Sequence, residues 1–293
     1  MNENTLLASI IKKSADDGVS RITMAIGCRN SGLQPTACAP ELYKYVDPTG
    51  GPNPPNAIQL STVLMIAWGG IITTSILTSS LQAANVYSAA DITAAVANQY
   101  TLNFLDNYTQ PQVNKLSAIA LYQGNLVTMS SGEAVTYLII SCMPGDYTPS
   151  PGSMIAALAA IGVNVGQLAQ NMAADYRSNY HCWVSQAISN QSFTRLLVFE
   201  SGGSTAVGWM PGLFTALQTF AQAQQQPNIT IASAMLSTGS VGADPSQVLT
   251  GIFTGAKTLM NVQGLELYAC KIVNYNSSWN TALVNTFNSL KTS

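Results

Sequence analysis

The chain has few charged side chains. Asp, Glu, Lys and Arg together make up 8% of its 293 residues, against about 25% in an ordinary soluble domain. Three long windows contain none of them, namely residues 48–90, 147–174 and 201–243. A surface of Ser, Thr, Asn and Gln is easier to remove from water than a charged one. The composition therefore predicts a working contact with lipid or with further copies of the chain.

Basic residues and metal-binding side chains are also scarce. Eleven Lys and Arg residues and a net charge of −2 provide no basic stripe for a phosphate backbone, so we expect no nucleic-acid partner. One His and five Cys, without a CxxC pair, argue against a zinc site and against a dense disulfide scaffold. We therefore expect no metal and mostly reduced cysteines.

The N-terminus lacks the basic start and unbroken apolar segment of a secretory signal, because charged residues interrupt residues 1–20. We expect synthesis in the cytoplasm without a signal peptide, followed by release or delivery to a host. Residues 60–78 are uncharged and long enough to cross a bilayer, yet they contain a Gly pair and lack basic flanks. Two interpretations stay open for them, a buried helix or a segment that inserts conditionally into membranes.

Local patterns predict a mainly helical first part, residues 1–110, and a sheet with alternating helices over residues 111–293. In the first part we expect a helix over 5–15, an extended piece over 21–27, a Pro/Gly-rich loop over 29–56, one long or two kinked helices over 57–84, and a helix over 89–105 capped by Ser88. In the second part we expect consecutive antiparallel strands over 116–122, 126–129 and 134–142, a long helix from the cap Ser153 to about Tyr180, strands over 193–200, 229–236 and 265–273, and helices over 211–224, 245–260 and 279–290. These patterns predict an α/β fold with a mixed β-sheet flanked by helices, as a single compact domain over residues 1–293.

Motifs of familiar enzymes are missing or incomplete. The segment Glu200–Ser204 follows a predicted strand, but it does not complete a nucleophile elbow, and the only histidine precedes it. Its glycines can cradle an anion at a helix N-terminus or simply form a tight turn. Glu133 and Glu266 lie near other predicted strands, yet the sequence does not bring two carboxylates together as a glycosidase needs. We therefore expect no enzyme of the acid–base kind.

Reactive and aromatic side chains concentrate in the segment Tyr176–Trp183, which contains the only His, two Tyr, one Trp and one Cys. On a continued helix Cys182 shares a polar face with Ser178, and a polar setting keeps the pKa of a thiol from rising as it does in a dry core. Cys142 and Cys270 stand in apolar strands and are expected in the core. Cys182 is the candidate reactive cysteine, with the alternative that it is another interior cysteine beside a packing Trp.

Four features occur together in this chain: the start MNENTLLASIIKKSADDG, the charge-poor helical middle, the mixed α/β order and the YHCW cysteine. In these features the chain resembles the Evf (Erwinia virulence factor) family of insect-gut persistence proteins. The resemblance implies a non-enzymatic virulence factor that carries a fatty acyl chain through a cysteine thioester and acts at lipid or host membranes. It also implies that Cys182 accepts a palmitate-like group. The acyl chain would then lie in a tunnel lined by Met172, Tyr176, Trp183 and Ile188.

Two other functions also fit a nearly neutral surface. A pore-forming cytolytic toxin would release residues 57–84 into lipid. A self-assembling coat or crystal protein would pack identical copies through uncharged faces. Leakage of dye from neutral liposomes identifies the toxin, and assembly that grows with concentration identifies the coat protein.

Overall fold

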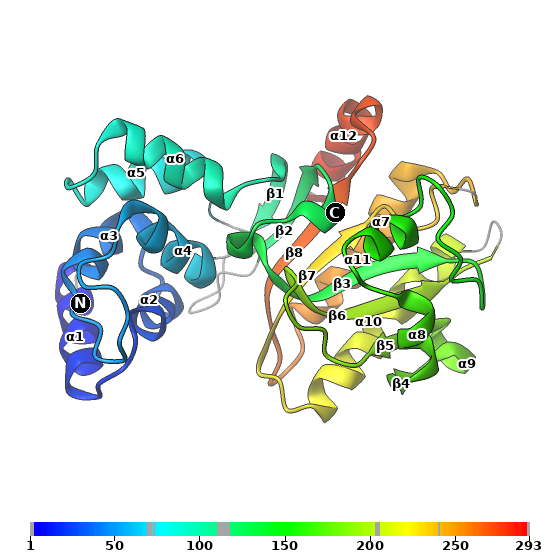
Figure 1. The fold of residues 1–293 in the computed structure, drawn as a ribbon, viewed down its shortest axis with the longest axis horizontal. Coiled ribbons are helices and arrows are strands. Elements are labelled where there is room, and N and C mark those ends of the chain that lie inside the picture. The colour runs from blue at the N-terminus through cyan, green and yellow to red at the C-terminus, as the bar shows by residue number, and fades with distance from the viewer. Residues whose placement is uncertain are drawn as a thin grey trace. The chain divides into compact units, whose positions relative to one another are not determined.

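The computed structural model describes residues 3–68, 72, 74–109, 118–202, 206–239 and 241–291 (Figure 1). The chain divides into two compact units. Unit 1 comprises Met1–Thr101, Thr109–Ser117 and Ser130–Glu133. Unit 2 comprises Leu102–Tyr108, Ala118–Met129 and Ala134–Ser293.

Unit 1 is helical over its described residues. Its elements are α1 (Glu3–Asp16), α2 (Arg21–Asn30), α3 (Pro35–Lys44), α4 (Ala57–Trp68), α5 (Thr74–Ala83), α6 (Ala89–Gln99) and the short 3-10 helix η3 (Ser131–Glu133). The apolar faces of α1 to α6 meet in one hydrophobic core, which includes Leu42, Leu64 and Trp68. Burial of this core is the main stabilising contribution in the unit.

The extended piece predicted over 21–27 and part of the loop predicted over 29–56 are wrong, because α2 and α3 form there. The Ser20 side chain accepts a hydrogen bond from the Thr23 N–H, which starts α2. Pro35 occupies the first turn of α3, where a missing N–H leaves no helical hydrogen bond unmade. Pro35 therefore marks a helix start, while the later prolines of the predicted loop, from Pro48 to Pro55, lie outside the helices.

Of the two forms predicted for residues 57–84, one long helix or two helices, the structure has two helices, α4 and α5. The predicted kink at Gly69 and Gly70 lies outside the described residues. Ser88 caps α6 in a capping box with Asp91. That helix ends at Gln99, so the predicted helix over 89–105 is too long. Among the described residues, no helix is both long and apolar enough to cross a membrane.

Unit 2 is built on an eight-stranded mixed sheet with the order β1-β2-β8-β7-β3-β6-β5-β4. The strands are β1 (Asn103–Thr109), β2 (Ala118–Gln123), β3 (Val135–Cys142), β4 (Met172–Asp175), β5 (Cys182–Ser185), β6 (Phe193–Glu200), β7 (Asn228–Ala234) and β8 (Glu266–Asn274). The other elements are η2 (Leu126–Thr128), α7 (Met154–Ala160), α8 (Val165–Gln170), α9 (Arg177–Tyr180), α10 (Ala206–Ala223), α11 (Pro245–Leu259), η4 (Ser277–Trp279) and α12 (Asn280–Lys291). Strands β2, β8, β7, β3 and β6 run parallel, whereas β5 and β4 are antiparallel additions at one edge.

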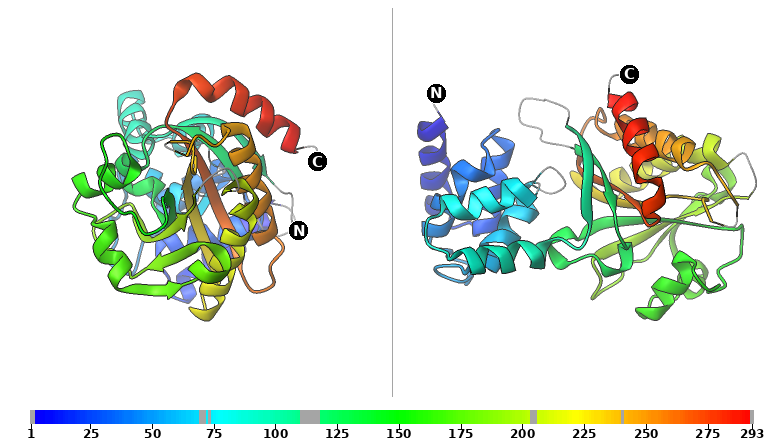
Figure 2. Two further views of the ribbon diagram at one scale, coloured as in Figure 1. Left: turned by 90° about the vertical axis from the view of Figure 1, so that its right-hand side faces the viewer. Right: turned by 90° about the horizontal axis from the view of Figure 1, so that it is seen from above.

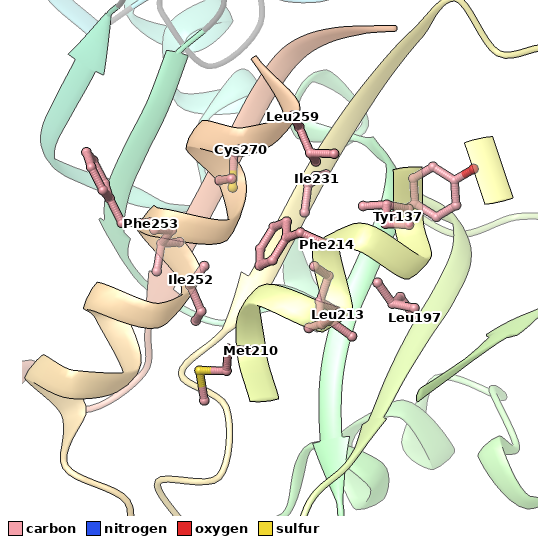
Figure 3. Packing of buried hydrophobic residues seen from close by; sticks show 14 of the residues in the cluster. Tyr137, Leu197, Met210, Leu213, Phe214, Ile231, Ile252, Phe253, Leu259 and Cys270 are labelled. Carbon is pink, nitrogen blue, oxygen red and sulfur yellow. The ribbon is translucent and has the colours of Figure 1, made fainter. Parts of the chain in front are cut away.

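Helices cover both faces of this sheet (Figure 2). On β6, Leu197 and Phe199 face a core shared with α10, α11 and α12, and Figure 3 shows side chains of α10, α11 and the strands meeting there. Leu196 and Val198 face a second core shared with α7 and α8. Because successive strand residues point to opposite faces, the apolar run in β6 serves both cores.

Two predictions in this unit are wrong. The segment predicted as a strand over 126–129 contains η2, so β2 and β3 are not successive antiparallel strands, and in the sheet β8 and β7 lie between them. Ser153 caps a helix as predicted, but α7 ends at Ala160, because Gly162 adopts a left-handed conformation with φ of 83°. The remaining stretch to Tyr180 forms α8, β4 and α9 in place of one long helix.

The predicted fold class, an α/β protein with a mixed sheet flanked by helices, is confirmed. The predicted alternation of strands and helices from β6 to α12 is also observed. A single domain over 1–293 with an internal division near residue 110 stays a prediction.

Candidate functional site

The chain leaves the neighbouring parallel strands β3 and β6 toward opposite faces of the sheet. Cys142 and Glu200, the last residues of the two strands, are register partners. After β3 the chain continues to α7 and α8 on one face, and after β6 it continues to α10 on the other. In open α/β sheets, ligands bind outside the carboxyl ends of the strands at such a point. The candidate site therefore lies at the carboxyl ends of β3 and β6.

A buried carboxylate occupies this position. Glu200 is 7% exposed and accepts a hydrogen bond on Oε1 from the Tyr147 hydroxyl. The N–H of Gly145 donates to its Oε2 at 3.3 Å. Tyr147 also packs edge-on against Trp183, with ring centroids 5.9 Å apart. These contacts hold the loop after β3 against the end of β6, and they orient the carboxylate.

A cation lies beside Glu200. The guanidinium of Arg177 approaches Glu200 Oε1 at 3.9 Å and forms two closer bonds to Asp175, with Nε–Oδ1 at 2.9 Å and Nη2–Oδ2 at 2.6 Å. The hydrogen bond from Arg177 lowers the pKa of Asp175, and the same contact raises the pKa of Arg177. Arg177 and Asp175 are partly exposed. The site therefore combines a shielded acceptor with a charged pair that solvent and ligands can reach.

Burial dominates the titration of the neutral groups in the site. Desolvation, with a smaller contribution from Glu200, raises the pKa of the Tyr147 phenol to about 12. Desolvation likewise raises the pKa of the Cys142 thiol to about 12. Both groups therefore stay protonated at neutral pH. Tyr147 acts as a hydrogen-bond donor, and Cys142 is not an activated nucleophile.

Hydroxyl groups from three strand ends meet on the α10 side. The side chains of Ser201 and Ser237 are hydrogen-bonded to each other and buried. Ser141 Oγ accepts the Ser237 N–H at 2.8 Å, and Ser237 has a left-handed φ of 61°. The Ser201 N–H donates to the Cys142 carbonyl at 3.0 Å. These bonds link the end of β3 to the loops after β6 and β7, at the carboxyl ends of the parallel strands.

The cysteine singled out from the sequence lies next to this polar end of the sheet, but its side chain is in the core. Cys182 is the first residue of β5, wholly buried in the core beneath α10, where desolvation raises the pKa of its thiol to about 12. The expected helix around it is absent, so Ser178 does not share a helical face with it. Cys142 and Cys270 are buried, as Cys28, Cys38 and Cys182 are.

The four residues expected to line an acyl tunnel are divided between the two faces of the sheet. Tyr176 packs with Cys182 on the α10 face. Trp183, Met172 and Ile188 pack on the opposite face. Ile188 also lines a surface pocket of about 200 Å³ formed mainly by residues of the α7–α8 and β5–β6 connections. The strand geometry thus does not bring these four side chains together around Cys182.

The other acidic residues noted in the sequence do not join the site. Glu133 belongs to unit 1 and accepts hydrogen bonds from Thr101 and Ser130. Glu266 begins β8, whereas Glu200 ends the parallel strand β6, so the two lie at opposite ends of the sheet. Within the described part of the chain, no cluster of three or more His, Cys, Asp or Glu side chains forms a metal site.

No protein-family model matches the chain, and no curated protein matches it. Solved structures similar to it include the Oceanobacillus iheyensis macrodomain with ADP, which is 12% identical with a TM-score of 0.47, over 63% of this chain and 96% of that one. The Trypanosoma brucei macrodomain in complex with ADP is 11% identical with a TM-score of 0.45, over 58% of this chain and 68% of that one. The same macrodomain in complex with ADP-ribose is 11% identical with a TM-score of 0.46, over the same shares.

These findings correct the resemblance to the Evf family, because no family model matches and the similar solved structures are macrodomains. The functions derived from it are corrected as well: a non-enzymatic, lipid-carrying virulence factor with lipid or a host membrane as partner. The alternatives of a cytolytic toxin and a self-associating coat protein find no support either. The burial and raised pKa of Cys182 supply a physical reason, since a protonated thiol in the core is a poor acyl acceptor. Acylation of Cys182 by a palmitate-like chain stays a prediction.

Glu200 and the segment around Arg177 stand out in the sequence, whereas Tyr147 does not. The pattern that could have identified Tyr147 is its place in the Pro/Gly-rich break after a buried strand, where loops at carboxyl ends carry functional side chains. Its pairing with Glu200 depends on the adjacency of β3 and β6, which chain order does not reveal.

Proposed function

We propose that this protein binds a small phosphorylated molecule at the carboxyl ends of β3 and β6. The observation that carries the proposal is the buried, oriented Glu200 at the point where two adjacent parallel strands continue to opposite faces. Buried carboxylates are costly unless they are hydrogen-bonded, and they are well suited to accept bonds from a polar ligand. The Glu200 carboxylate would accept hydrogen bonds from hydroxyl groups of the ligand, and Tyr147 would fix the orientation of the carboxylate.

The start of α10 supports the phosphate part of the proposal. This helix of 18 residues begins six residues after Glu200 and has no acidic residue in its first turn. The first N–H groups of a helix have no partner within the helix, and its dipole favours a negative charge there. Small and hydroxyl residues, Ser201 to Thr205, precede it in the sequence. Arg177, beside Glu200, supplies a positive charge.

Calorimetric titration tests the proposal, with ribose 5-phosphate, AMP, ADP, ADP-ribose and inorganic phosphate as probes. We expect at least one of the organic phosphates to bind, and Glu200→Gln to weaken it about tenfold, as expected for loss of a charge-assisted hydrogen bond. Glu133→Gln is the matched control, since it removes another buried carboxylate from unit 1 and leaves the site intact. Absence of binding by every probe at millimolar concentration, or equal weakening by both variants, would overturn the proposal.

A further inference from the structure

Two rings stack beside the carboxyl end of β6. The imidazole of His181 and the indole of Trp209 have centroids 3.9 Å apart and planes inclined by 19°. Both side chains are partly exposed. His181 is the only histidine of the chain, and Trp209 is the fourth residue of α10. The stack therefore joins the segment before β5 to the first turn of the helix that would face the phosphate.

The backbone holds His181 next to Glu200. The N–H of Glu200 donates to the His181 carbonyl at 2.7 Å, and the N–H of His181 donates to the Arg177 carbonyl at 3.2 Å. His181 ends α9 in a left-handed conformation with φ of 53°. Glycine or asparagine is usual at such a position, because a larger side chain is strained there. Local strain that persists at a ligand site suggests a role for the side chain that bears it.

Two further aromatic residues precede His181 in the chain. Tyr176, which precedes α9, and Tyr180, its last residue, have ring centroids 6.4 Å apart. Tyr180 packs closely over Gly212 of α10, where an added Cβ would lie 3.1 Å from its Cδ1. This packing fixes α9 on α10 and with it the position of His181. Rigid aromatic surfaces bind flat rings with little loss of conformational freedom.

We infer that the ligand carries a planar heteroaromatic ring, which His181 and Trp209 bind by stacking. The inference rests on the proposed function and narrows its ligand from any phosphorylated molecule to a nucleoside phosphate. A ring on this stack is close to the backbone of Glu200 and to the first turn of α10. One ligand can therefore use the stack and the helix start together.

Titrations with AMP and ribose 5-phosphate isolate the contribution of the ring, because the two probes share sugar and phosphate. We expect AMP to bind about tenfold or more tightly than ribose 5-phosphate, as base stacking on aromatic side chains provides. His181→Gly removes the ring and relieves the left-handed strain, so the variant stays folded, which circular dichroism verifies. We expect it to lose most of the preference for AMP while its affinity for ribose 5-phosphate is unchanged. Trp209→Phe keeps a stacking surface and should retain more of the preference than Trp209→Ala.

The outcomes separate the two proposals. Equal affinity for AMP and ribose 5-phosphate would overturn the inference and leave the proposed function intact. A full preference for AMP in both folded variants, His181→Gly and Trp209→Ala, would also overturn it, because the ring would then bind elsewhere. Absence of binding by both probes and by the other phosphates would overturn the proposed function, and the inference with it.

Discussion

Units 1 and 2 both bury charged side chains, but they surround them differently. In unit 1 the guanidinium of Arg21 donates to the carbonyls of Leu42, Tyr45 and Pro52 at 2.6–2.9 Å. In unit 2 the carboxylate of Glu200 lies at strand ends, beside the partly exposed Arg177. A buried charge whose donors bond to backbone carbonyls and to the Asn53 side chain is a structural element. A buried charge at the edge where loops leave a parallel sheet is available to a ligand.

Removing the Arg21 guanidinium should have the largest effect on the stability of unit 1. Arg21→Met removes the donor from three buried carbonyls and from Asn53 Oδ1, and it removes the positive charge 4.0 Å from Asp47. We expect the free energy of unfolding of unit 1 to fall by about 3–5 kcal/mol, as when one partner of a buried ionic network is removed. Urea titration followed by hydrogen exchange of α2 and α3 peptides measures this loss.

Arg195→Met in unit 2 is the matched control. Arg195 donates one bond to the Ser185 carbonyl at 2.8 Å and lies over the Phe220 ring, while it stays partly exposed. Its removal should lower the free energy of unfolding by about 1 kcal/mol, because solvent can replace the lost contact. Equal losses for the two variants would contradict the structural role given to Arg21.

The contact between α10 and α11 in unit 2 depends on close packing and not on charge. A Cβ on Gly255 of α11 would lie 2.2 Å from Cδ2 of Phe214 in α10. Gly255→Ala should therefore lower the free energy of unfolding by about 1–3 kcal/mol through overpacking, despite the better helix propensity of alanine. At Gly251 the added Cβ would lie 3.0 Å from the sulfur and 3.3 Å from the Cβ of Met210, so Gly251→Ala should cost less than Gly255→Ala. Thermal unfolding of both variants checks the contrast, and a stabilised Gly255→Ala would refute it.

Sequence patterns predicted unit 2 better than unit 1 for a physical reason. From β6 to α12, buried strands and amphipathic helices alternate, and caps such as Asp244 mark their starts. In unit 1 the short helices α2 and α3 depend on a cap and a proline that resemble loop signals. The helix predicted after Ser153 was too long because one glycine ends α7. Short elements are decided by single residues and tertiary contacts, which periodicity does not detect.

The candidate site was only partly predictable. Glu200 and Arg177 stood out in the sequence, but their proximity depends on the antiparallel pairing of β5 with β6. Tyr147 comes 53 positions before Glu200 and reaches it only because β3 and β6 are neighbours. The polar environment predicted for Cys182 depends on a helix that the structure does not have. In β5 the side chain of Cys182 packs in the core instead.

Two of the buried carboxylates, Glu133 in unit 1 and Glu200 in unit 2, are expected to differ in their contribution to stability. Glu133 Oε2 accepts from both the N–H and the hydroxyl of Thr101 and of Ser130, at 2.6–3.1 Å. Glu133→Gln should lower the free energy of unfolding by about 2 kcal/mol, because several charge-assisted bonds weaken in a buried setting. Glu200→Gln should cost less than about 1 kcal/mol, since Arg177 is partly exposed and solvent screens the pair. Urea titration measures both, and a larger loss at Glu200 would assign that residue a mainly structural role.

A small, pH-dependent contribution to the stability of unit 1 is expected from Asp47. Burial alone would raise the pKa of this carboxyl, but hydrogen bonds from Thr49 and from the Arg21 N–H, with the Arg21 charge, lower it below its ordinary value. A lowered pKa in the folded state contributes stability above the ordinary pKa of about 4, and that stability is lost as the pH falls through the folded value. At pH 7 Asp47→Asn should therefore be less stable than the natural chain by on the order of 1 kcal/mol. Below about pH 4 the difference should shrink, because the protonated carboxyl also carries no charge. Hydrogen exchange of α2 peptides between pH 7 and acid measures it, and a constant difference would show that the carboxylate charge contributes nothing to unit 1.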